Sequence, residues 1–284
     1  MMQTRFHILR SLNRGAYGQL YAAEDAETGK KVVVKVIEKL EEEDRGLIAR
    51  EIKANAMMKG TKGICTLHAY IDEGRQTSLV FDVVHGADLF TVLQRRDFQP
   101  LEEKMVWKIV NQVAEALFAC HQKGIAHRDV KLENVRHTDD ASIQPLNPYQ
   151  IMMERDRVFL IDFGLCTFFK VTDGKESLSS DYCGSPEYIS PEHFKQTPLR
   201  ATQVDAWALG ITTYALLFGV FPYGLDEMPT TFTSCSTIPL PPDTEDLIVS
   251  RGMRDRLTRL LTIDPTKRSS VKIMMDLPLH RSSI

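Results

Sequence analysis

The segment that decides the fold is His127–Asn134, with the sequence HRDVKLEN, and the shorter segment Ile161–Gly164, IDFG, follows it. Asp129 and Asn134 lie five positions apart on one predicted loop, and Asp162 comes at the end of an apolar run typical of a strand. Together they offer one carboxylate base and two oxygen ligands of the kind that Mg²⁺ binds beside phosphate groups. The two segments therefore indicate a metal and phosphate site, and chance is a poor explanation for them.

A lysine within an apolar strand is the next candidate. Lys35 lies in VVVKV, where strand alternation places it on the face that Val33 shares. An ammonium group on an apolar face needs an anionic partner, which Glu51 in the helix-favouring LIAREIKA or a nucleotide phosphate can supply. The alternative is an exposed lysine on an edge strand.

Two glycines lie three positions apart, Gly15 and Gly18, in LNRGAYGQLY. Glycine allows a strand turn to bring its backbone N–H groups close to a phosphate. The motif is weak by itself, because an ordinary glycine-bearing hairpin has the same pattern.

The order of predicted elements divides the chain into a small β-rich part and a larger helical part. Residues 5–37 contain three short strand-like runs, residues 41–58 favour a helix, and residues 66–70 and 78–84 again favour strands. Residues 101–122 form an amphipathic helix that Gly124 stops. Its apolar stripe is Val106, Ile109, Val110, Val113, Leu117 and Cys120.

Composition sets broad limits on the class of protein. The 284 residues include 35 basic and 38 acidic side chains, a net charge of −3, which argues against a nucleic-acid binder that depends on bulk positive charge. The five cysteines are scattered without a CxxC pair, and the first residues carry no apolar signal-peptide region. We therefore expect an intracellular protein of the cytoplasm or nucleus.

Residues 206–225, AWALGITTYALLFGVFPYGL, carry no charge and nearly reach the length that spans a bilayer. Two threonines, two tyrosines, three glycines and Pro222 argue against insertion. A helix buried on all sides would have the same composition, so we predict a central helix and no membrane contact.

The blocks HRDVKLEN, IDFG and SPE (190–192), in this order, resemble those of eukaryotic protein kinases. The resemblance covers residues 6–275 and implies an α+β, bilobal protein-kinase-like fold. It has a small antiparallel N-lobe with one main helix (1–84), a hinge (82–88), a larger mainly helical C-lobe (89–276) and a short tail (277–284). The implied reaction is transfer of the γ-phosphoryl group of ATP, with Mg²⁺, to serine or threonine hydroxyls of protein substrates.

The resemblance also implies roles for the residues singled out above. Asp129 is then the catalytic base and Lys131 steadies the γ-phosphate, while Lys35 holds the α- and β-phosphates with Glu51 as its partner. The implied metal ligands are Asn134 and Asp162.

The nucleotide site implied by the resemblance combines the glycine hairpin, the hinge and two lobe surfaces. Phe81 takes the gatekeeper position, Asp82 and Val84 belong to the hinge, and Asp88 is placed to accept hydrogen bonds from the ribose. The full set is Leu12, Asn13, Gly15, Ala16, Tyr17, Gly18, Leu20, Val33, Lys35, Phe81, Asp82, Val84, Asp88 and Arg136.

Several positions depart from the family pattern. Asn13 replaces the first loop glycine, Leu20 a valine and Val33 an alanine. Arg136 stands where an apolar side chain forms the floor under adenine, so we expect its stem to form that floor while its head reaches solvent, with weakened or altered nucleotide affinity. The extra residues 138–156 predict an exposed loop, either functional or a neutral insertion.

Three further contacts are implied by the resemblance. Glu192 pairs with Arg268, and Asp205 caps the catalytic loop from the start of the central helix. In the activation loop, which lies between Asp162 and Glu192, Asp181 occupies the position that often holds a phosphorylated Thr or Ser, and we expect it to supply part of the negative charge that Arg128 requires. Candidate phosphorylation sites are Ser177, Ser179 and Ser180.

The choice of function class remains between an active kinase and a pseudokinase scaffold that keeps only the fold. Lys131 and GSPEY favour the serine/threonine class, and the peptide-groove segment CGSPEYISPE argues against a small-molecule kinase. SSDYCGSPEYISPE also resembles fungal nutrient-responsive and meiosis-controlling serine/threonine kinases. We expect a monomeric catalytic unit controlled by the activation loop, the 138–156 insertion or another protein.

Overall fold

The first layer of the structure is an antiparallel sheet of five strands. The computed structural model describes residues 5–15, 18–39, 42–137, 157–245 and 247–275. The strand order is β1-β2-β3-β5-β4, and all neighbours are antiparallel. The bounds are β1 Phe6–Gly15, β2 Gly18–Asp25, β3 Lys31–Glu38, β4 Leu67–Asp72 and β5 Gln76–Asp82. The β-branched residues of the third run form a strand, as predicted, and the structure places this strand in the middle of the sheet.

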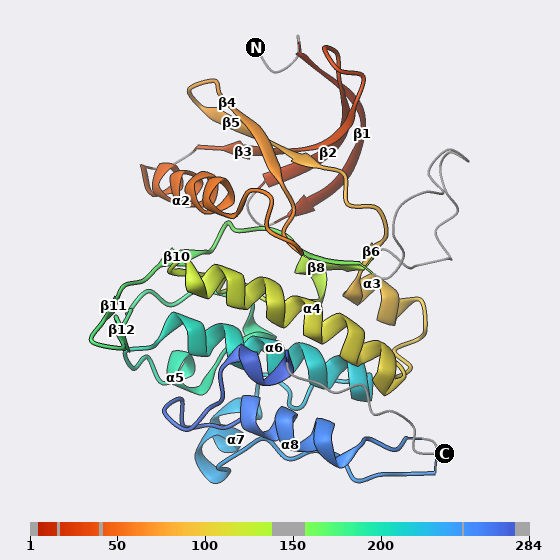
Figure 1. Cartoon of the computed structure of the whole chain (residues 1–284), viewed down its shortest axis with the longest axis vertical. Coiled ribbons are helices and arrows are strands. Elements are labelled where there is room, and N and C mark those ends of the chain that lie inside the picture. The colour runs from red at the N-terminus through yellow and green to blue at the C-terminus, as the bar shows by residue number, and fades with distance from the viewer. Residues whose placement is uncertain (1–4, 16–17, 40–41, 138–156, 246, 276–284) are drawn as a thin grey trace.

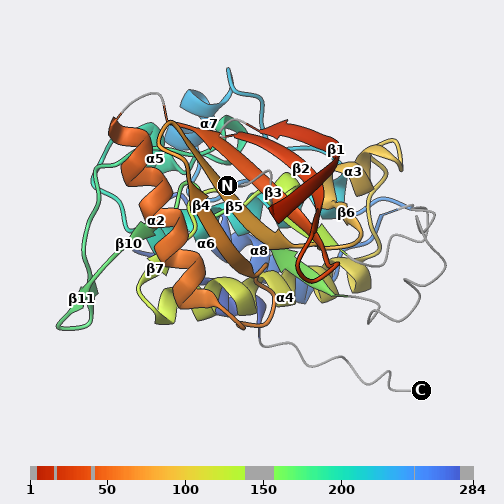
Figure 2. The same ribbon diagram turned by 90° about the horizontal axis from the view of Figure 1, so that it is seen from above.

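One helix, α2 (Glu42–Met58), lies alongside this sheet, as Figures 1 and 2 show. Ile48 of the helix packs in one buried cluster with Ile37 and Leu79 of the sheet. This apolar contact fixes the face of α2 that carries Glu51, which is buried. The helix therefore presents a carboxylate toward strand β3.

The second part of the molecule is mainly helical and lies below the sheet in Figure 1. Its long helices are α4 (Glu103–Gln122) and α6 (Ala201–Phe218). The predicted apolar stripe of α4 is buried, and Gly124 just beyond the helix has φ 71°, the left-handed conformation expected of a glycine stop. The smaller helices are α3 Leu89–Gln94, α5 Pro191–Phe194, α7 Met228–Ser234, α8 Arg251–Leu260, η1 Leu132–Asn134, η3 Pro186–Tyr188 and η4 Val271–Met274.

Helix α6 is the buried helix predicted from the uncharged stretch 206–225, but its limits differ. It begins at Ala201 and ends at Phe218, because Gly219 takes φ 72° and residues 219–225 turn away. A Cβ on Gly219 would collide with the backbone oxygen of Phe98, so no other residue suits this turn. Among the described residues, no helix is long and apolar enough to cross a membrane.

The chain passes from the sheet to the helical part between residues 82 and 87. Strand β6 (Ala87–Asp88) pairs with β8 (Val135–His137), which pairs with β9 (Val158–Leu160). The remaining short strands are β7 Ile125–Ala126, β10 Thr167–Phe168, β11 Val171–Thr172 and β12 Lys175–Glu176. The predicted 138–156 insertion and 277–284 tail, with Ala16 and Tyr17, lie outside the described residues.

Candidate active site

Lys35 joins three elements by ion pairs. Its Nζ atom donates to Glu51 Oε1 at 2.9 Å and Oε2 at 3.1 Å, and to Asp162 Oδ1 at 2.7 Å. Burial alone would lower the pKa of Lys35, but the two carboxylates outweigh it and raise this pKa above its usual range. The predicted pairing of Lys35 with Glu51 is confirmed, and the surface-lysine alternative is excluded.

The loop that carries Asp129 forms a closed set of hydrogen bonds. Asn134 Nδ2 donates to Asp129 Oδ2 at 2.8 Å, and Lys131 Nζ lies 2.9 Å from the same oxygen. Ser185 Oγ donates to Asp129 Oδ1 at 3.0 Å and accepts from Lys131 Nζ at 2.7 Å. A serine hydroxyl thus lies between the carboxylate and the ammonium group.

Asp205, near the start of α6, accepts hydrogen bonds from the backbone of this loop. Its carboxylate accepts from the backbone N–H of His127 at 2.9 Å and of Arg128 at 2.7 Å, and His121 Nε2 lies 2.8 Å from it. Burial alone would raise the pKa of Asp205, but these contacts hold it below its usual value. The predicted capping role of Asp205 is confirmed by these contacts.

Asp162 has an unusual backbone conformation that aims its side chain at Lys35. Its φ is 64°, rare for a residue other than glycine, and its Oδ1 also accepts from the N–H of Gly164 at 3.1 Å. Phe163 is buried with its ring centroid 4.8 Å from that of His127. Burial would raise the pKa of Asp162, but Lys35 lowers it, so the group is a carboxylate.

The glycine hairpin joins β1 to β2, and Gly15 pairs with Gly18 across it. Gly18 has φ 150°, and a Cβ at this position would overlap the backbone oxygen of Val36. Asn13 pairs with Leu20 on the same hairpin, directly after a register shift between Ser11 and Asn13. The hairpin therefore approaches strand β3 closely next to Lys35.

The other predicted nucleotide contacts lie along strands β1, β2, β3 and β5 and the hinge. Leu20 is the register partner of Lys35, and Val33 is the partner of Phe81. Phe81 and Val84 are half-buried, whereas Leu12 is exposed. The Oδ1 atom of the exposed Asp82 lies 2.6 Å from the Nε2 atom of His68.

Arg136 differs from the expectation for it, whereas the ribose contact of Asp88 stays a prediction. The head of Arg136 does not reach freely into solvent: Nη2 donates to the backbone oxygen of Gly86, Nη1 lies 4.0 Å from Asp88 Oδ2, and Nε is buried without a partner among the described residues. Asp88 caps helix α3, because its oxygens accept from the N–H and Oγ1 of Thr91 at 2.8 and 2.9 Å. Asp88 caps α3 because it directly precedes the helix, and strand pairing brings Arg136 near it, since Asp88 and Arg136 are register partners.

Two predicted ion pairs anchor the far end of the site. Arg268 donates to both oxygens of Glu192, at 2.7 and 2.8 Å, and neither side chain is more than 3% exposed. Arg128 Nη2 donates to Asp181 Oδ2 at 2.9 Å. Both pairings are confirmed.

Sequence reasoning missed Ser185, Tyr188 and Arg50. Tyr188 Oη accepts from the N–H of Leu132 at 3.2 Å, and Arg50 Nη1 lies 3.7 Å from Asp181 Oδ2. Ser185 and Tyr188 stood within the quoted GSPEY segment, but only the fold brings them to the catalytic loop. Nothing in the sequence indicated that Arg50 contacts Asp181.

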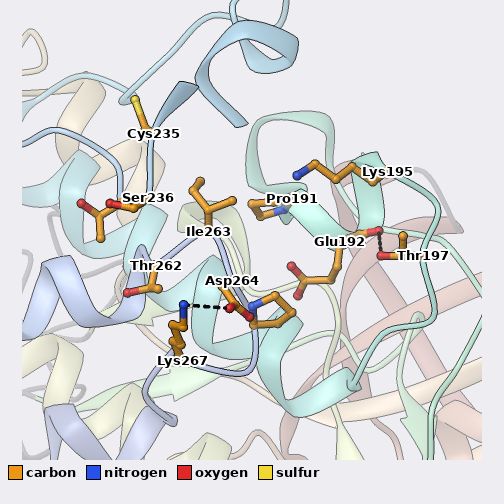
Figure 3. Close-up of a pocket in the computed structure, with 12 residues that line it drawn as sticks. Pro191, Glu192, Lys195, Thr197, Cys235, Ser236, Thr262, Ile263, Asp264 and Lys267 are labelled. Atoms are coloured by element: carbon orange, nitrogen blue, oxygen red, sulfur yellow. Dashed lines mark hydrogen bonds and ion pairs between the residues drawn. The ribbon is translucent and has the colours of Figure 1, made fainter. Parts of the chain in front are cut away.

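A separate pocket of about 580 Å³ lies between α5 and the chain around residues 235–237 and 262–267, as Figure 3 shows. Lys195 and Lys267 line it, and Lys267 is 3.5 Å from Asp264. None of its lining residues belongs to the predicted catalytic, metal or nucleotide set. It is thus distinct from the site around Asp129.

The two-part fold and these contacts are those of a protein kinase, and comparison with known proteins gives the same family. The family described as "Protein kinase domain" matches residues 6–279, so the chain belongs to the protein kinase family.

Among curated proteins, the chain is similar to NUAK family SNF1-like kinase 1 of Homo sapiens, at 27% identity over 80% of the chain and 32% of the relative. It is 28% identical to the carbon catabolite-derepressing protein kinase of Candida tropicalis, over 96% of the chain and 40% of the relative. Serine/threonine-protein kinase PLK4 of Danio rerio is 26% identical over 98% of the chain and 27% of that protein. The chain thus spans less than half the length of these relatives.

Proposed function

We propose that this chain transfers the γ-phosphoryl group of ATP to serine and threonine hydroxyls of protein substrates. The observation that carries the proposal is the position of Asp129, whose two oxygens face Ser185 at 3.0 Å and Asn134 at 2.8 Å. A hydroxyl donor already occupies the hydrogen-bond position that an incoming substrate hydroxyl requires. The similarity to a named serine/threonine-protein kinase supports the same acceptor class.

In this reaction, the substrate oxygen forms a bond to the γ-phosphorus and the bond from that phosphorus to the ADP oxygen breaks. The substrate proton passes to the Asp129 carboxylate, which lies within hydrogen-bond reach of a hydroxyl. Lys131, 2.9 Å from Asp129, is placed to neutralise the charge on the transferred group. Lys35, held by Glu51, is placed for the other phosphates.

The residues present fit a divalent cation. The Nδ2 atom of Asn134 is committed to Asp129, which leaves its amide oxygen as the ligand atom. The contacts of Asp162 with Lys35 and Gly164 both use Oδ1, so Oδ2 is the atom for a metal. Oxygen ligands of this kind suit Mg²⁺, which when bound neutralises phosphate charge.

The experiment is transfer of labelled phosphate from ATP to a serine/threonine peptide library in the presence of Mg²⁺. We expect wild-type transfer, and a loss of about 10²-fold or more in kcat for Asp129→Asn, because an amide cannot accept the proton. The matched control is Asp97→Asn, an exposed aspartate in the turn after α3.

Two outcomes contradict the proposal. One is a wild-type chain that binds nucleotide but transfers nothing, which would identify a pseudokinase scaffold. The other is an Asp129→Asn variant as active as the Asp97→Asn control. Addition of EDTA should also stop transfer in the wild-type chain, since the phosphate charge is then left without its cation.

A further inference from the structure

The pocket between α5 and the segments that follow α7 and α8 has the size of a ligand site (Figure 3). Its volume of about 580 Å³ lies within the range of about 300–1,000 Å³ that is usual for such sites. None of its lining residues takes part in the reaction proposed above, so its use has to be argued from its own chemistry.

Backbone hydrogen bonds hold the walls of this pocket together. The N–H of Ile263 donates to the Ser236 backbone oxygen at 2.9 Å, which joins the segment after α7 to the segment after α8. On the α5 side, the N–H and the hydroxyl of Thr197 donate to the Glu192 backbone oxygen at 3.0 and 3.2 Å. The pocket is therefore preformed in the folded chain.

The carboxylates that line the pocket are already paired. Both oxygens of Glu192 accept from Arg268, and the Glu192 side chain is 3% exposed. Asp264 Oδ1 accepts from the N–H and hydroxyl of Thr266, and Asp264 Oδ2 lies 3.5 Å from Lys267 Nζ. Among the described residues that line the pocket, no unpaired carboxylate would therefore repel an anion.

Lys195 is the cation in this pocket that lacks a carboxylate partner. Its Nζ atom donates to the backbone oxygen of Phe232 at 3.3 Å, and no aspartate or glutamate of the described ranges pairs with it. Figure 3 shows this amine beside Pro191 at the rim of the pocket. A ligand that brings a carboxylate to the rim would give Lys195 the counter-charge that the chain itself does not supply.

The space next to this amine is apolar, and it opens on the surface. Pro191 and Ile263 are buried residues that line it, and Pro265 is half-buried. The side chains at its mouth are exposed, namely Lys195, Thr197, Ser236 and Lys267. Sites for small molecules usually enclose most of the ligand surface, whereas an extended peptide needs only to lay one side chain into an open pocket.

We propose that this pocket binds an acidic segment of the protein substrates, with a glutamate or aspartate carboxylate on Lys195 and a neighbouring aliphatic side chain on Pro191 and Ile263. The proposal rests on the proposed kinase function and specifies its substrates further than the acceptor hydroxyl does. Charge complementarity determines the choice of an anion, and the open mouth determines the choice of a peptide.

The pocket lies close enough to Asp129 for one substrate to reach both. Ser185, which contacts Asp129 at 3.0 Å, precedes Pro191 by six positions, and six residues span at most about 22 Å. A ten-residue glycine-serine linker spans about 16–19 Å on average and about 33 Å when extended. A docking segment and an acceptor serine separated by about ten residues can therefore occupy both sites at once.

Binding is tested first, without ATP, on the full chain. The probe is a fluorescent peptide that carries Glu-Leu-Glu between glycine and serine residues, and anisotropy gives its Kd. A peptide with Gln-Leu-Gln in its place should bind about tenfold more weakly, and affinity for Glu-Leu-Glu should fall as salt is raised, because salt screens exposed charges.

Variants of the rim locate the charge that the peptide meets. Lys195→Gln should weaken binding of the Glu-Leu-Glu peptide about threefold, and Lys195→Glu more than about tenfold, because it replaces attraction with repulsion. Ser236→Trp, which fills the mouth from an exposed position, should also weaken binding. The matched control is Lys59→Glu, an exposed lysine just after α2, which should bind as wild type.

Hydrogen exchange locates the bound peptide independently of activity. The Glu-Leu-Glu peptide should slow exchange in residues 191–197 and 235–237 and leave residues 127–134 unchanged. Protection of residues 127–134 alone would place the peptide in the catalytic site and contradict the proposal.

Transfer of phosphate tests the connection to substrates. An acceptor peptide joined to Glu-Leu-Glu by a ten-residue linker, placed before or after the acceptor, should in at least one order have a KM about tenfold below that of the acceptor alone, with kcat unchanged. Lys195→Glu should remove this advantage and leave transfer to the acceptor alone unchanged. Free Glu-Leu-Glu peptide should raise the KM of the joined peptide only.

Three results overturn the proposal: equal affinity for the Glu-Leu-Glu and Gln-Leu-Gln peptides, equal affinity of Lys195→Glu and Lys59→Glu, or equal KM for the joined and unjoined acceptors. Failure of the proposed function is a different result, a wild-type chain that transfers phosphate to no peptide. In that case anisotropy and exchange alone decide whether the pocket binds an acidic segment.

Discussion

The Nζ atom of Lys35 lies 2.7 Å from the Oδ1 atom of Asp162, although the two residues are 127 positions apart. This contact joins strand β3 of the sheet to the segment that follows β9 in the helical part. The two parts of the molecule therefore meet through charged side chains at the site where phosphates are proposed to bind.

Removal of the lysine should abolish most transfer. In Lys35→Met, Glu51 and Asp162 lose their shared cation, and kcat/KM for ATP should fall about 10²-fold or more because the phosphate charge is no longer stabilised. The measurement is steady-state transfer to a peptide. Lys31→Met, an exposed lysine on the same strand, should behave as wild type. Transfer by Lys35→Met at more than a tenth of the wild-type rate would contradict the role assigned to Lys35.

The buried pair Glu192–Arg268 should matter for stability. Arg268→Leu leaves the Glu192 carboxylate buried and unpaired, so the free energy of unfolding should fall by about 3–5 kcal/mol. Urea unfolding followed by tryptophan fluorescence suits this test, because Trp207 is fully buried in the folded chain and becomes exposed on unfolding.

The control for that pair is Arg259→Leu, whose exposed ion pair with Asp255 should contribute less than about 1 kcal/mol. The double variant Glu192→Leu/Arg268→Leu should be less destabilised than the sum of its single changes. Equal losses for Arg268→Leu and Arg259→Leu would show that burial of the pair has no special effect.

Asp205 should give the stability of the chain an acid-sensitive component. The pKa of this carboxyl is lower in the folded chain than its ordinary value of 3.8, so its stabilising contribution is complete above that value and is lost as pH falls through the folded pKa. Asp205→Asn should lower the free energy of unfolding at pH 7 by about 1–3 kcal/mol. Its deficit should shrink as pH falls below about 4. Urea unfolding at a series of pH values measures this difference, and a deficit that grew with acid would refute it.

Arg136 should weaken nucleotide binding. Its head contacts Gly86 and approaches Asp88, so it places a charged group where the resemblance predicts an apolar floor. Arg136→Leu should lower KM for ATP roughly three- to tenfold through added apolar contact with the base, with kcat unchanged. Arg136→Lys, which keeps the charge, should not lower it. A higher KM in Arg136→Leu would instead indicate that the guanidinium itself supports the nucleotide site.

Local patterns predicted the elements of the fold well. The stripe from Val106 to Cys120 predicted the buried face of α4, and the β-branched run around Lys35 predicted a strand, although not its central place in the sheet. The end of α6 was wrong because the apolar composition continues past Phe218, while the chain stops the helix at Gly219 to pass close to Phe98. An apolar composition predicts that a segment is buried, but it does not predict the residue at which the backbone turns.

The sequence placed Asp129 and Asn134 together on one loop and Asp205 as the cap of that loop, and the structure shows these contacts, whereas the catalytic role of Asp129 stays a prediction. Contacts of the site were missed where they depend on segments that meet only in the folded chain, as for Ser185 with Asp129, 56 positions apart, and Arg50 with Asp181. The head of Arg136 was misplaced because its position depends on pairing between β6 and β8. Such pairings follow from tertiary packing and have no local signature.

The hydrogen bonds of Asp205 have a consequence for the order in which the protein is made. Asp205 accepts hydrogen bonds from the N–H groups of His127 and Arg128, and these two residues leave the ribosome 78 and 77 residues before Asp205 does. Because the chain is synthesised from its N-terminus, the loop that bears Asp129 lacks this support until α6 begins to emerge. A nascent chain stalled before residue 201 should therefore hold the complete HRDVKLEN segment without its native geometry.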